Sequence, residues 1–440
     1  NRQMNEIRKE ISVLIFCSVN FLICLSSEQP DSIYQNFLKF RTLYSSGNFA
    51  AAEKCMLSVF VNYADLPDNY YIAALNNVGL IKKSTGLYQE ALEYYNKAEE
   101  MIGDRKDMLI ELASIYNNIS RIYTFQKSFS TAIEYLEKSV NIYSDIKQSN
   151  KTVLHNLSTA YLNLGIIYFE TGDYKQALKN LEKSDSLKTL YRLPESELVF
   201  LNMAKTYSRN GNPDDAGKYF LKSLNTMEWK FGKDYYRISE VYFSYSDFLY
   251  ETGRSVDALQ AHQNALKICL SNYGKKHPLV SLAYKQLADY YFNQSEFLKS
   301  LEYYQNALIA IDNKFNDHDL MANPSIDSSL FELRLLDILK NKSKAMNLYA
   351  SGEKKDSIRI RFLKASLLTS DLAFRLIDRI RNNYLTEESR LYLSRAERET
   401  YITGVKIAGS LFTITGDNSY RIAMYDIAQR AKAANLRNDI

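Results

Sequence analysis

Residues 164–181 read LGIIYFETGDYKQALKNL and hold the pattern that decides the fold. Four positions of this stretch, Gly165, Tyr168, Ala177 and Leu181, recur at a fixed relation elsewhere in the chain. The same frame returns at 78–98 and 203–220, with weaker copies centred on Ala52, Ala132, Ala258 and Ser300. Self-similarity at a period of a few tens of residues predicts a stack of repeats rather than a single globular core.

Each recurring position has a physical purpose in a pair of helices. The small residue, Gly165, lets two helices approach closely, and a large side chain there would overpack the pair at a cost of about 1–3 kcal/mol. Gly172 stands where the first helix ends and a positive φ is favourable. Ala177 on the second helix fits against the first. The frame therefore predicts an antiparallel helix pair in each repeat.

The marker position of the second helix falls at 52, 91, 132, 177, 216, 258 and 300, so the steps are 39, 41, 45, 39, 42 and 42 residues. The frame is close to the tetratricopeptide signature, whose minimal repeat takes about 34 residues. These longer repeats resemble those of kinesin light chains, and GKKHPLV at 274–280 resembles their connector. The resemblance implies an all-α, right-handed superhelix (an α-solenoid) of about seven repeats over 28–311, which binds a protein or peptide in its concave groove.

A degenerate segment is expected after the repeats. Residues 312–328 are polar, contain Asn323-Pro324 and predict a loop, and 329–440 predict further repeat-like helices. One helix is expected over 356–383. Thr386 is expected to cap another that runs to about Thr413.

The C-terminal helices carry a second resemblance. DLAFRLIDRIR at 371–381, YLTEESR at 384–390, TGD at 415–417 and AQRAKA at 428–433 resemble the helical segment before the caspase-like peptidase domain of bacterial CHAT proteins. This implies the regulatory arm of a longer peptidase, although no residue here corresponds to that family's catalytic His and Cys. The alternatives are the sensory half of a membrane-spanning transcriptional regulator and a free-standing envelope assembly protein.

A secretory signal is predicted over residues 1–27, of which the first three precede the start methionine. A basic pair at 8–9 is followed by an apolar run at 11–25, and the small Cys24 and Ser26 fit cleavage after Ser26. We therefore expect export to the periplasm or cell envelope. An uncleaved anchor and a lipoprotein anchor on Cys24 are the alternatives, but the run is shorter than the ~20 residues that span a bilayer. No later segment is apolar enough to span a membrane.

The composition is that of a folded protein, with 46% hydrophobic and 24% charged residues. The net charge of +4 is small for 440 residues and gives no electrostatic reason to expect a nucleic-acid partner. Cys55 and Cys269 belong to distant repeats and are expected to be free thiols packed as small apolar residues.

Catalytic residues, metal ligands and cofactor motifs are not predicted, so we do not expect an enzyme. None of the four histidines has a Cys, Asp or Glu at metal-ligand spacing on a shared helical face. His262 occupies an apolar position of its repeat and is expected in the core, and His277 is expected to cap a helix. The chain has no phosphate loop, no Gly-x-Ser-x-Gly motif and no Cys–His pair.

Asparagines recur just before the leucine-like and small residues in four consecutive repeats, at Asn77, Asn118, Asn163 and Asn202. This position lies on the first helix of each pair, which lines the concave face of such a superhelix. Amides one repeat apart can hydrogen-bond the backbone of an extended peptide, because each carries two donors and an acceptor. The alternative is that asparagine stabilises the contact between helices.

Three basic residues share that helical face. Arg121 and Lys205 lie three residues beyond Asn118 and Asn202, and Arg209 lies one turn further. They are candidates to hold an acidic side chain or a C-terminal carboxylate. In later repeats the face changes to Ser244, Asp247, Gln286 and Asp289, so we expect the anion preference to fade toward the C-terminus.

Overall fold

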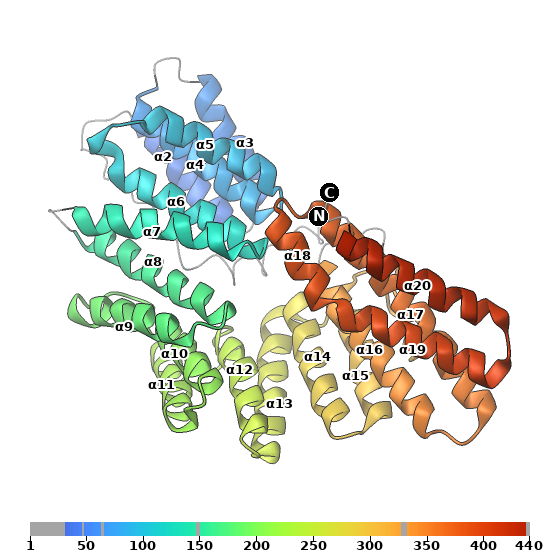
Figure 1. The fold of residues 1–440 in the computed structure, drawn as a ribbon. Coiled ribbons are helices and arrows are strands. Elements are labelled where there is room, and N and C mark those ends of the chain that lie inside the picture. Colours follow the sequence, from blue (N-terminus) through green and yellow to red (C-terminus); the bar gives the residue numbers. More distant parts are fainter. Residues whose placement is uncertain (1–30, 46–47, 63–65, 147–149, 327–331, 437–440) are drawn as a thin grey trace. The chain divides into compact units, whose positions relative to one another are not determined.

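A computed structural model describes residues 31–45, 48–62, 66–146, 150–326 and 332–436. The predicted signal at 1–27 lies outside these residues. All regular secondary structure in the described part is helical, which confirms the prediction of an all-α solenoid of antiparallel helix pairs (Figure 1). The chain divides into two compact units, residues 1–237 (unit 1) and 238–440 (unit 2).

In unit 1 the first helix of each pair packs on the second, and each second helix packs on the first helix of the next pair. The pairs, in chain order, are α2 (Asp31–Ser45) with α3 (Phe49–Asn62), α4 (Asp68–Ser84) with α5 (Tyr88–Ile102), α6 (Leu109–Phe125) with α7 (Phe129–Asp145), α8 (Lys151–Glu170) with α9 (Tyr174–Leu190), and α10 (Ser196–Arg209) with α11 (Pro213–Phe231). A short 3-10 helix, η1 (Lys106–Met108), precedes α6.

Unit 2 continues with three further pairs and then three helices that depart from the repeat. The pairs are α12 (Ile238–Glu251) with α13 (Ser255–Tyr273), α14 (Pro278–Asn293) with α15 (Phe297–Ile311), and α16 (Glu332–Gly352) with α17 (Asp356–Asn383). The last helices are α18 (Glu387–Ala396), α19 (Arg398–Thr415) and α20 (Asn418–Leu436). Helix α19 packs against both α17 and α20.

The small residues of the frame do what their size predicts. A Cβ atom added at Gly79 would lie 2.6 Å from Cε1 of Tyr95, and one at Gly165 would lie 2.7 Å from Cγ of Leu181. Gly172 has φ +83° and ends the first helix of its repeat. The close approach of the two helices therefore depends on the missing side chain.

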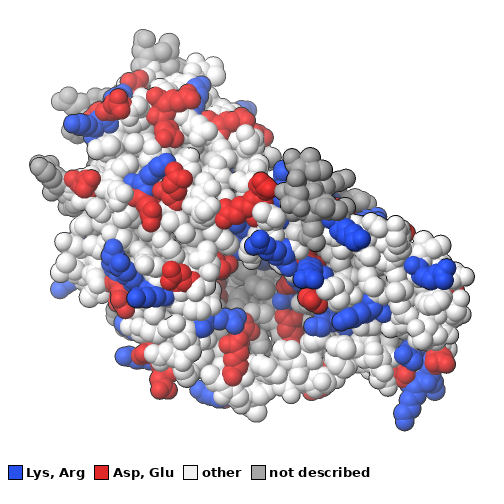
Figure 2. Space-filling model, viewed as in Figure 1, with Lys and Arg blue, Asp and Glu red and all other residues white. Residues whose placement is uncertain are grey.

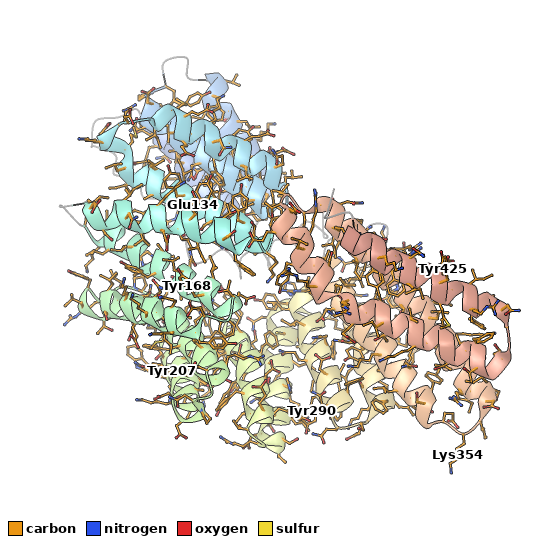
Figure 3. All side chains as sticks on the ribbon, in the orientation of Figure 1. Glu134, Tyr168, Tyr207, Tyr290, Lys354 and Tyr425 are labelled. Atoms are coloured by element: carbon orange, nitrogen blue, oxygen red, sulfur yellow. The ribbon has the colours of Figure 1, made fainter. Side chains whose placement is uncertain are left out.

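Aromatic trios recur in every second repeat, 84 residues apart, a regularity that the sequence analysis missed. Two rings of each trio come from a first helix and the third from the second helix. The stacked pairs have similar geometry: 5.9 Å and 10° for Tyr123–Tyr135, 5.5 Å and 18° for Tyr207–Tyr219, and 5.3 Å and 11° for Tyr291–Tyr303. The third members are Tyr116, Phe200 and Tyr284. Tyr207, labelled in Figure 3, belongs to α10.

Residues 312–326 contain no helix and are held by two lysines from outside the segment. Lys276 donates from Nζ to backbone carbonyls of Ile309 and Asp312, at 2.6 and 2.8 Å. Lys342 is fully buried on α16 and donates to the Ala322 carbonyl at 2.6 Å. The polar segment is therefore anchored through its own backbone.

The helix expected from Thr386 to about Thr413 is instead two helices, and the prediction of a single one is wrong. The cap itself is confirmed, because the Thr386 side chain accepts a hydrogen bond from the Ser389 N–H at 3.2 Å. The break falls at Glu397, which is 5% exposed. Its carboxylate accepts hydrogen bonds from Lys340 at 3.0 Å and Thr400 at 2.7 Å, and the chain changes direction where that carboxylate turns inward.

Candidate functional site

The four recurring asparagines lie on α4, α6, α8 and α10, the first helices of consecutive pairs in unit 1. We call Asn77, Asn118, Asn163 and Asn202 the ladder asparagines, and the position that they share the ladder position. Asn77 and Asn118 are buried, each with 5% exposure, while Asn163 and Asn202 are half-buried. Asn77 donates from Nδ2 to Sδ of Met56 at 3.5 Å, and Asn202 donates to the Leu198 carbonyl of its own helix at 2.8 Å. Their amides thus already have partners within the protein.

The side-chain amides of the other two asparagines each donate a hydrogen bond to the equivalent residue of the preceding repeat. Asn118 donates from Nδ2 to Oδ1 of Asn76 at 3.1 Å, and Asn163 donates to Oδ1 of Asn117 at 3.0 Å. Each acceptor is the residue just before the ladder position of the previous repeat. For Asn202 the equivalent residue is Leu162, which has no acceptor on its side chain. These contacts favour a stabilising role for Asn118 and Asn163, and peptide binding by the ladder stays a prediction.

The predicted basic residues occupy the same helices. Arg121 on α6 and Lys205 on α10 are half-buried, and Arg209 at the end of α10 is exposed. The Lys205 ammonium lies 4.9 Å from the centroid of the Phe169 ring, a cation–π contact. The structure therefore brings Lys205 against an aromatic ring and Arg121 next to the buried polar groups described below.

A residue that the sequence analysis missed, Lys83, lies in the last turn of α4 and contacts Asn118. Its side chain is 5% exposed on α4, and Nζ donates to Oδ1 of Asn118 at 3.2 Å. Burial, and then the charge of Arg121, hold the pKa of Lys83 well below its usual range. Its position seven residues after Asn76 places both on one helical face, and that spacing is the signal that could have revealed it.

Two buried tyrosines complete the surroundings of Arg121. The Tyr95 hydroxyl is fully buried and has no hydrogen-bond partner among the described residues. The Tyr44 hydroxyl shares a 2.7 Å hydrogen bond with Ser84. Burial raises the pKa of Tyr95 well above its usual range, the charge of Tyr44 raises it further, and Arg121 opposes both. We refer to Lys83, Tyr95, Asn118 and Arg121 as the Lys83 cluster.

The first-helix face of unit 2 differs in its charge balance. Lys285 on α14 pairs with Asp289 at 2.8 Å and with Asp337 at 2.7 Å. Lys340 on α16 pairs with Glu397 at 3.0 Å. The lysines on this face of unit 2 are thus paired with carboxylates. In unit 1, by contrast, the pKa of Lys83 is lowered by burial and by the like charge of Arg121.

The remaining candidate residues have structural partners. His277 caps α14, as predicted, since its Nδ1 accepts from the Leu279 N–H at 3.2 Å, and its ring stacks on Tyr273 at 4.1 Å. His262 is buried, as predicted, and burial lowers its pKa to about 4. Cys55 and Cys269 are buried free thiols, which confirms that prediction.

The described residues contain no group of three or more His, Cys, Asp or Glu side chains placed to hold a metal ion. Within the same part of the chain, the search for helices of membrane-spanning length and hydropathy finds none. On the face shown in Figure 2, acidic and basic side chains are interspersed rather than gathered by sign.

Comparison with known proteins supports the repeat assignment. A tetratricopeptide repeat family model matches residues 111–184 and 237–313, and a second one matches 72–104. The search of curated proteins finds no match. Neither family model reaches residues 371–440, whose resemblance to the CHAT-associated segment stays a prediction.

Two Rap structures share the fold, and other solved structures are similar over part of the chain. Apo RapI is 16% identical, with a TM-score of 0.51 over 63% of this chain and 97% of its own. A Rap protein complexed with competence and sporulation factor is 11% identical, with a TM-score of 0.51 over 91% of this chain and 100% of its own. Kinesin-light-chain TPR-like repeats from Podosopora anserina are 14% identical, with a TM-score of 0.39 over 46% of this chain and 95% of theirs.

The Rap likeness extends over nine-tenths of the chain, so it also includes helices after residue 313. At these identities the likeness describes the fold alone. Together with the recurring frame and the helix pairs, the family matches show that this chain carries tetratricopeptide repeats.

Proposed function

We propose that this repeat scaffold binds a polypeptide on the first-helix face of unit 1, where the Lys83 cluster holds a carboxylate of the ligand. The observation that carries the proposal is the buried Lys83 side chain, whose Nζ donates its described hydrogen bond to a neutral amide oxygen, Asn118 Oδ1, at 3.2 Å. The carboxylate is either an Asp or Glu side chain or the ligand's own C-terminus.

The electrostatics of the cluster support an anionic ligand. Burial and the like charge of Arg121 both disfavour the protonated form of Lys83, and an opposite charge placed beside it would favour that form. A carboxylate supplies that opposite charge together with acceptors for Lys83 Nζ. It also supplies an acceptor for the Tyr95 hydroxyl, which is buried and unpartnered among the described residues.

The fold relatives support binding of a ligand by such an array. One of them is a Rap protein complexed with competence and sporulation factor. In this chain, the half-buried Asn163 and Asn202, on the same row of first helices, are candidates to contact the ligand backbone. Arg121, Lys205 and Arg209 add positive charge along that row.

The test compares peptides that differ only in their carboxylates. Acidic peptides selected on the immobilised full chain are measured with a free or amidated C-terminus, and with Asp and Glu replaced by Asn and Gln. Loss of the recognised carboxylate should abolish measurable binding. Lys83→Met should weaken it by about 10- to 100-fold, because the amino group that would pair with the carboxylate is removed. Methionine is apolar and similar in size to lysine, so the fold should stay intact.

A pair of Tyr→Phe variants provides the matched control. Tyr95→Phe removes a hydroxyl without a described partner, so stability should hold while affinity falls about 2- to 12-fold. Tyr70 is also buried with an unpartnered hydroxyl but lies at the other end of α4, so Tyr70→Phe should change neither quantity. Equal binding of acidic and neutralised peptides would show that the cluster is purely structural.

The wider context of this binding is also part of the proposal. The resemblance of residues 371–440 supports a role as the regulatory arm of a CHAT-type peptidase, and the segment at 1–27 supports export. The encoded sequence downstream of Ile440 tests the first point: a caspase-like domain with His and Cys motifs is expected. N-terminal sequencing of protein recovered from a bacterial envelope fraction tests the second, with a start near Ser27 expected.

A further inference from the structure

The single tryptophan of the chain lies on the outward side of α11 and is 84% exposed. Leu221, two turns earlier on the same helix, is 49% exposed. The opposite side of α11 is buried against α10 through Ala216, Phe220, Ser223, Leu224 and Met227. Trp229 therefore contributes little to the core, although a tryptophan buries 150–250 Å² when it is packed.

Two lysines lie in the same outward stripe, at Lys218 and Lys222. The Lys222 ammonium lies 3.7 Å from the centroid of the Phe200 ring, and the Lys218 ammonium lies 5.9 Å from that of Tyr219. Neither lysine takes part in an ion pair within the described residues. The rings position both cations without neutralising them, so each keeps its charge for an outside partner.

We infer that the outward stripe of α11 docks an acidic polypeptide segment that carries bulky apolar side chains. The stripe consists of Lys218, Leu221, Lys222, Asn225 and Trp229, which follow one another at intervals of one, three or four residues along one side of the helix. A ligand that fits this stripe needs two features together: an apolar surface that covers Trp229 and Leu221, and carboxylates that lie opposite the two lysines. An exposed tryptophan flanked by charge is typical of the residues that dominate binding energy at protein interfaces.

The charges of α11 as a whole favour a polypeptide over an anionic membrane. Asp214 and Asp215 precede the lysines, and Glu228 adjoins Trp229. A membrane surface presents a diffuse negative field, which would repel these acids as it attracted Lys218 and Lys222. A polypeptide can place its carboxylates opposite the lysines alone. The site lies on α11, so it is separate from the Lys83 cluster, whose residues belong to α4, α5 and α6.

The tryptophan makes the test direct, because its fluorescence reports on this surface alone. The probe is a synthetic helical peptide with Leu along one side and Glu on either flank, paired with a peptide that has Lys in place of every Glu. When the Glu peptide is added to the full chain, the emission of Trp229 should shift to shorter wavelength and become less quenchable by acrylamide, in a saturable way. The Lys peptide should leave the emission unchanged.

Variants on the stripe should reverse the preference. Lys218→Glu combined with Lys222→Glu should weaken binding of the Glu peptide by about 4-fold or more and admit the Lys peptide. Val256 is 82% exposed on α13, another second helix, and Val256→Asp should leave the fluorescence response unchanged. Tyr95→Phe should also have no effect, which separates this site from the proposed carboxylate site.

Four results would overturn the inference. An equal shift with both peptides would mean apolar adhesion without charge recognition, and no shift with either would mean that the stripe docks no such segment. A shift with phosphatidylserine vesicles but not with the Glu peptide would assign the surface to membranes. A shift that grows with protein concentration, together with dimers in sedimentation, would assign it to a second copy of the chain.

Discussion

Asn118 donates a hydrogen bond from Nδ2 to Oδ1 of Asn76 at 3.1 Å, joining the first helices of two successive repeats. The same Asn118 accepts from Lys83 Nζ through its Oδ1, so one buried amide bonds both to a neighbouring amide and to a buried lysine. The contact lies between α4 and α6, where any change in the angle between repeats would separate its atoms. This hydrogen bond therefore helps to fix the orientation of one repeat relative to the next.

We predict that Asn118→Ala destabilises the chain by about 1–3 kcal/mol in urea unfolding, because it leaves the Asn76 amide and Lys83 without a partner. A double-mutant cycle with Asn76→Ala should give a coupling of about 0.5–1.5 kcal/mol. Asn202→Ala is the matched control, since that amide bonds to its own helix and should cost less. Purely additive effects of the Asn76 and Asn118 changes would contradict the contact.

We predict that Gly165→Ala destabilises unit 1 by about 1–3 kcal/mol, because the added methyl would meet Leu181 Cγ at 2.7 Å. Gly409 on α19 is the control, since its nearest neighbour to an added Cβ is Met424 Cε at 3.6 Å. In Gly409→Ala, the higher helix propensity of alanine should leave the free energy of unfolding unchanged or raise it by up to about 1 kcal/mol. Thermal unfolding of the two variants gives the comparison, and equal effects would show that helix propensity rather than close packing decides at Gly165.

Stability should fall with acidification between about pH 6.5 and pH 4 because of two buried histidines. Burial, with a smaller effect of Lys188, lowers the pKa of His155 to about 4, and burial lowers that of His262 to about 4. In this window the unfolded chain binds a proton at each histidine while the folded chain does not. Each can thus remove up to about 1.4 kcal/mol per pH unit as the pH falls.

The variant His262→Phe checks that pH dependence, because phenylalanine keeps a ring beside Tyr290 and cannot be protonated. Its unfolding free energy should vary less steeply with pH than that of the parent between pH 6.5 and 4. A parent slope retained in His262→Phe would mean that carboxylates alone account for the acid sensitivity.

Breaking the Glu397–Lys340 pair should destabilise unit 2 more than breaking an exposed pair. Glu397 is 5% exposed, and Glu397→Ala leaves the partly buried Lys340 with only the Asp337 carboxylate, at 3.4 Å, so it should cost up to about 3 kcal/mol. The exposed Arg254–Asp257 pair is the control, and Asp257→Ala should cost no more than about 1 kcal/mol. Chemical denaturation measures both, and similar losses would place Glu397 among ordinary surface charges.

Local features of the chain were predictable where neighbouring residues decide them. Thr386 and His277 cap their helices through a backbone N–H only two or three residues away, so the sequence around each is sufficient. The break at Glu397 was not predictable, because it depends on Lys340, 57 residues earlier in the chain. The sequence from Thr386 to Thr413 contains no residue that would end a helix by itself. The helix ends where the Glu397 carboxylate turns inward to Lys340, and the local sequence does not show that contact.

The candidate site was also predictable only in part. The spacing of Asn77, Asn118, Asn163 and Asn202 placed them on one face of successive first helices, since helical and repeat periods are properties of the sequence. Which of their amides bond to a neighbour depends on the side chain that the preceding repeat presents, Asn117 to Asn163 but Leu162 to Asn202.

What the sequence determined by itself was the repeat, the helix pairs and the small residues on which close packing depends, because these follow from period and volume. Only the tertiary structure decided the state of Lys83, which in the sequence is one of two adjacent lysines near a helix end and in the fold is buried beside Arg121. Its hydrogen bond and its charge environment come from Asn118 and Arg121 of α6, which stand far from Lys83 in the chain. The outward position of Trp229 was likewise decided by packing, since it is the side of α11 buried on α10 that leaves Trp229 exposed.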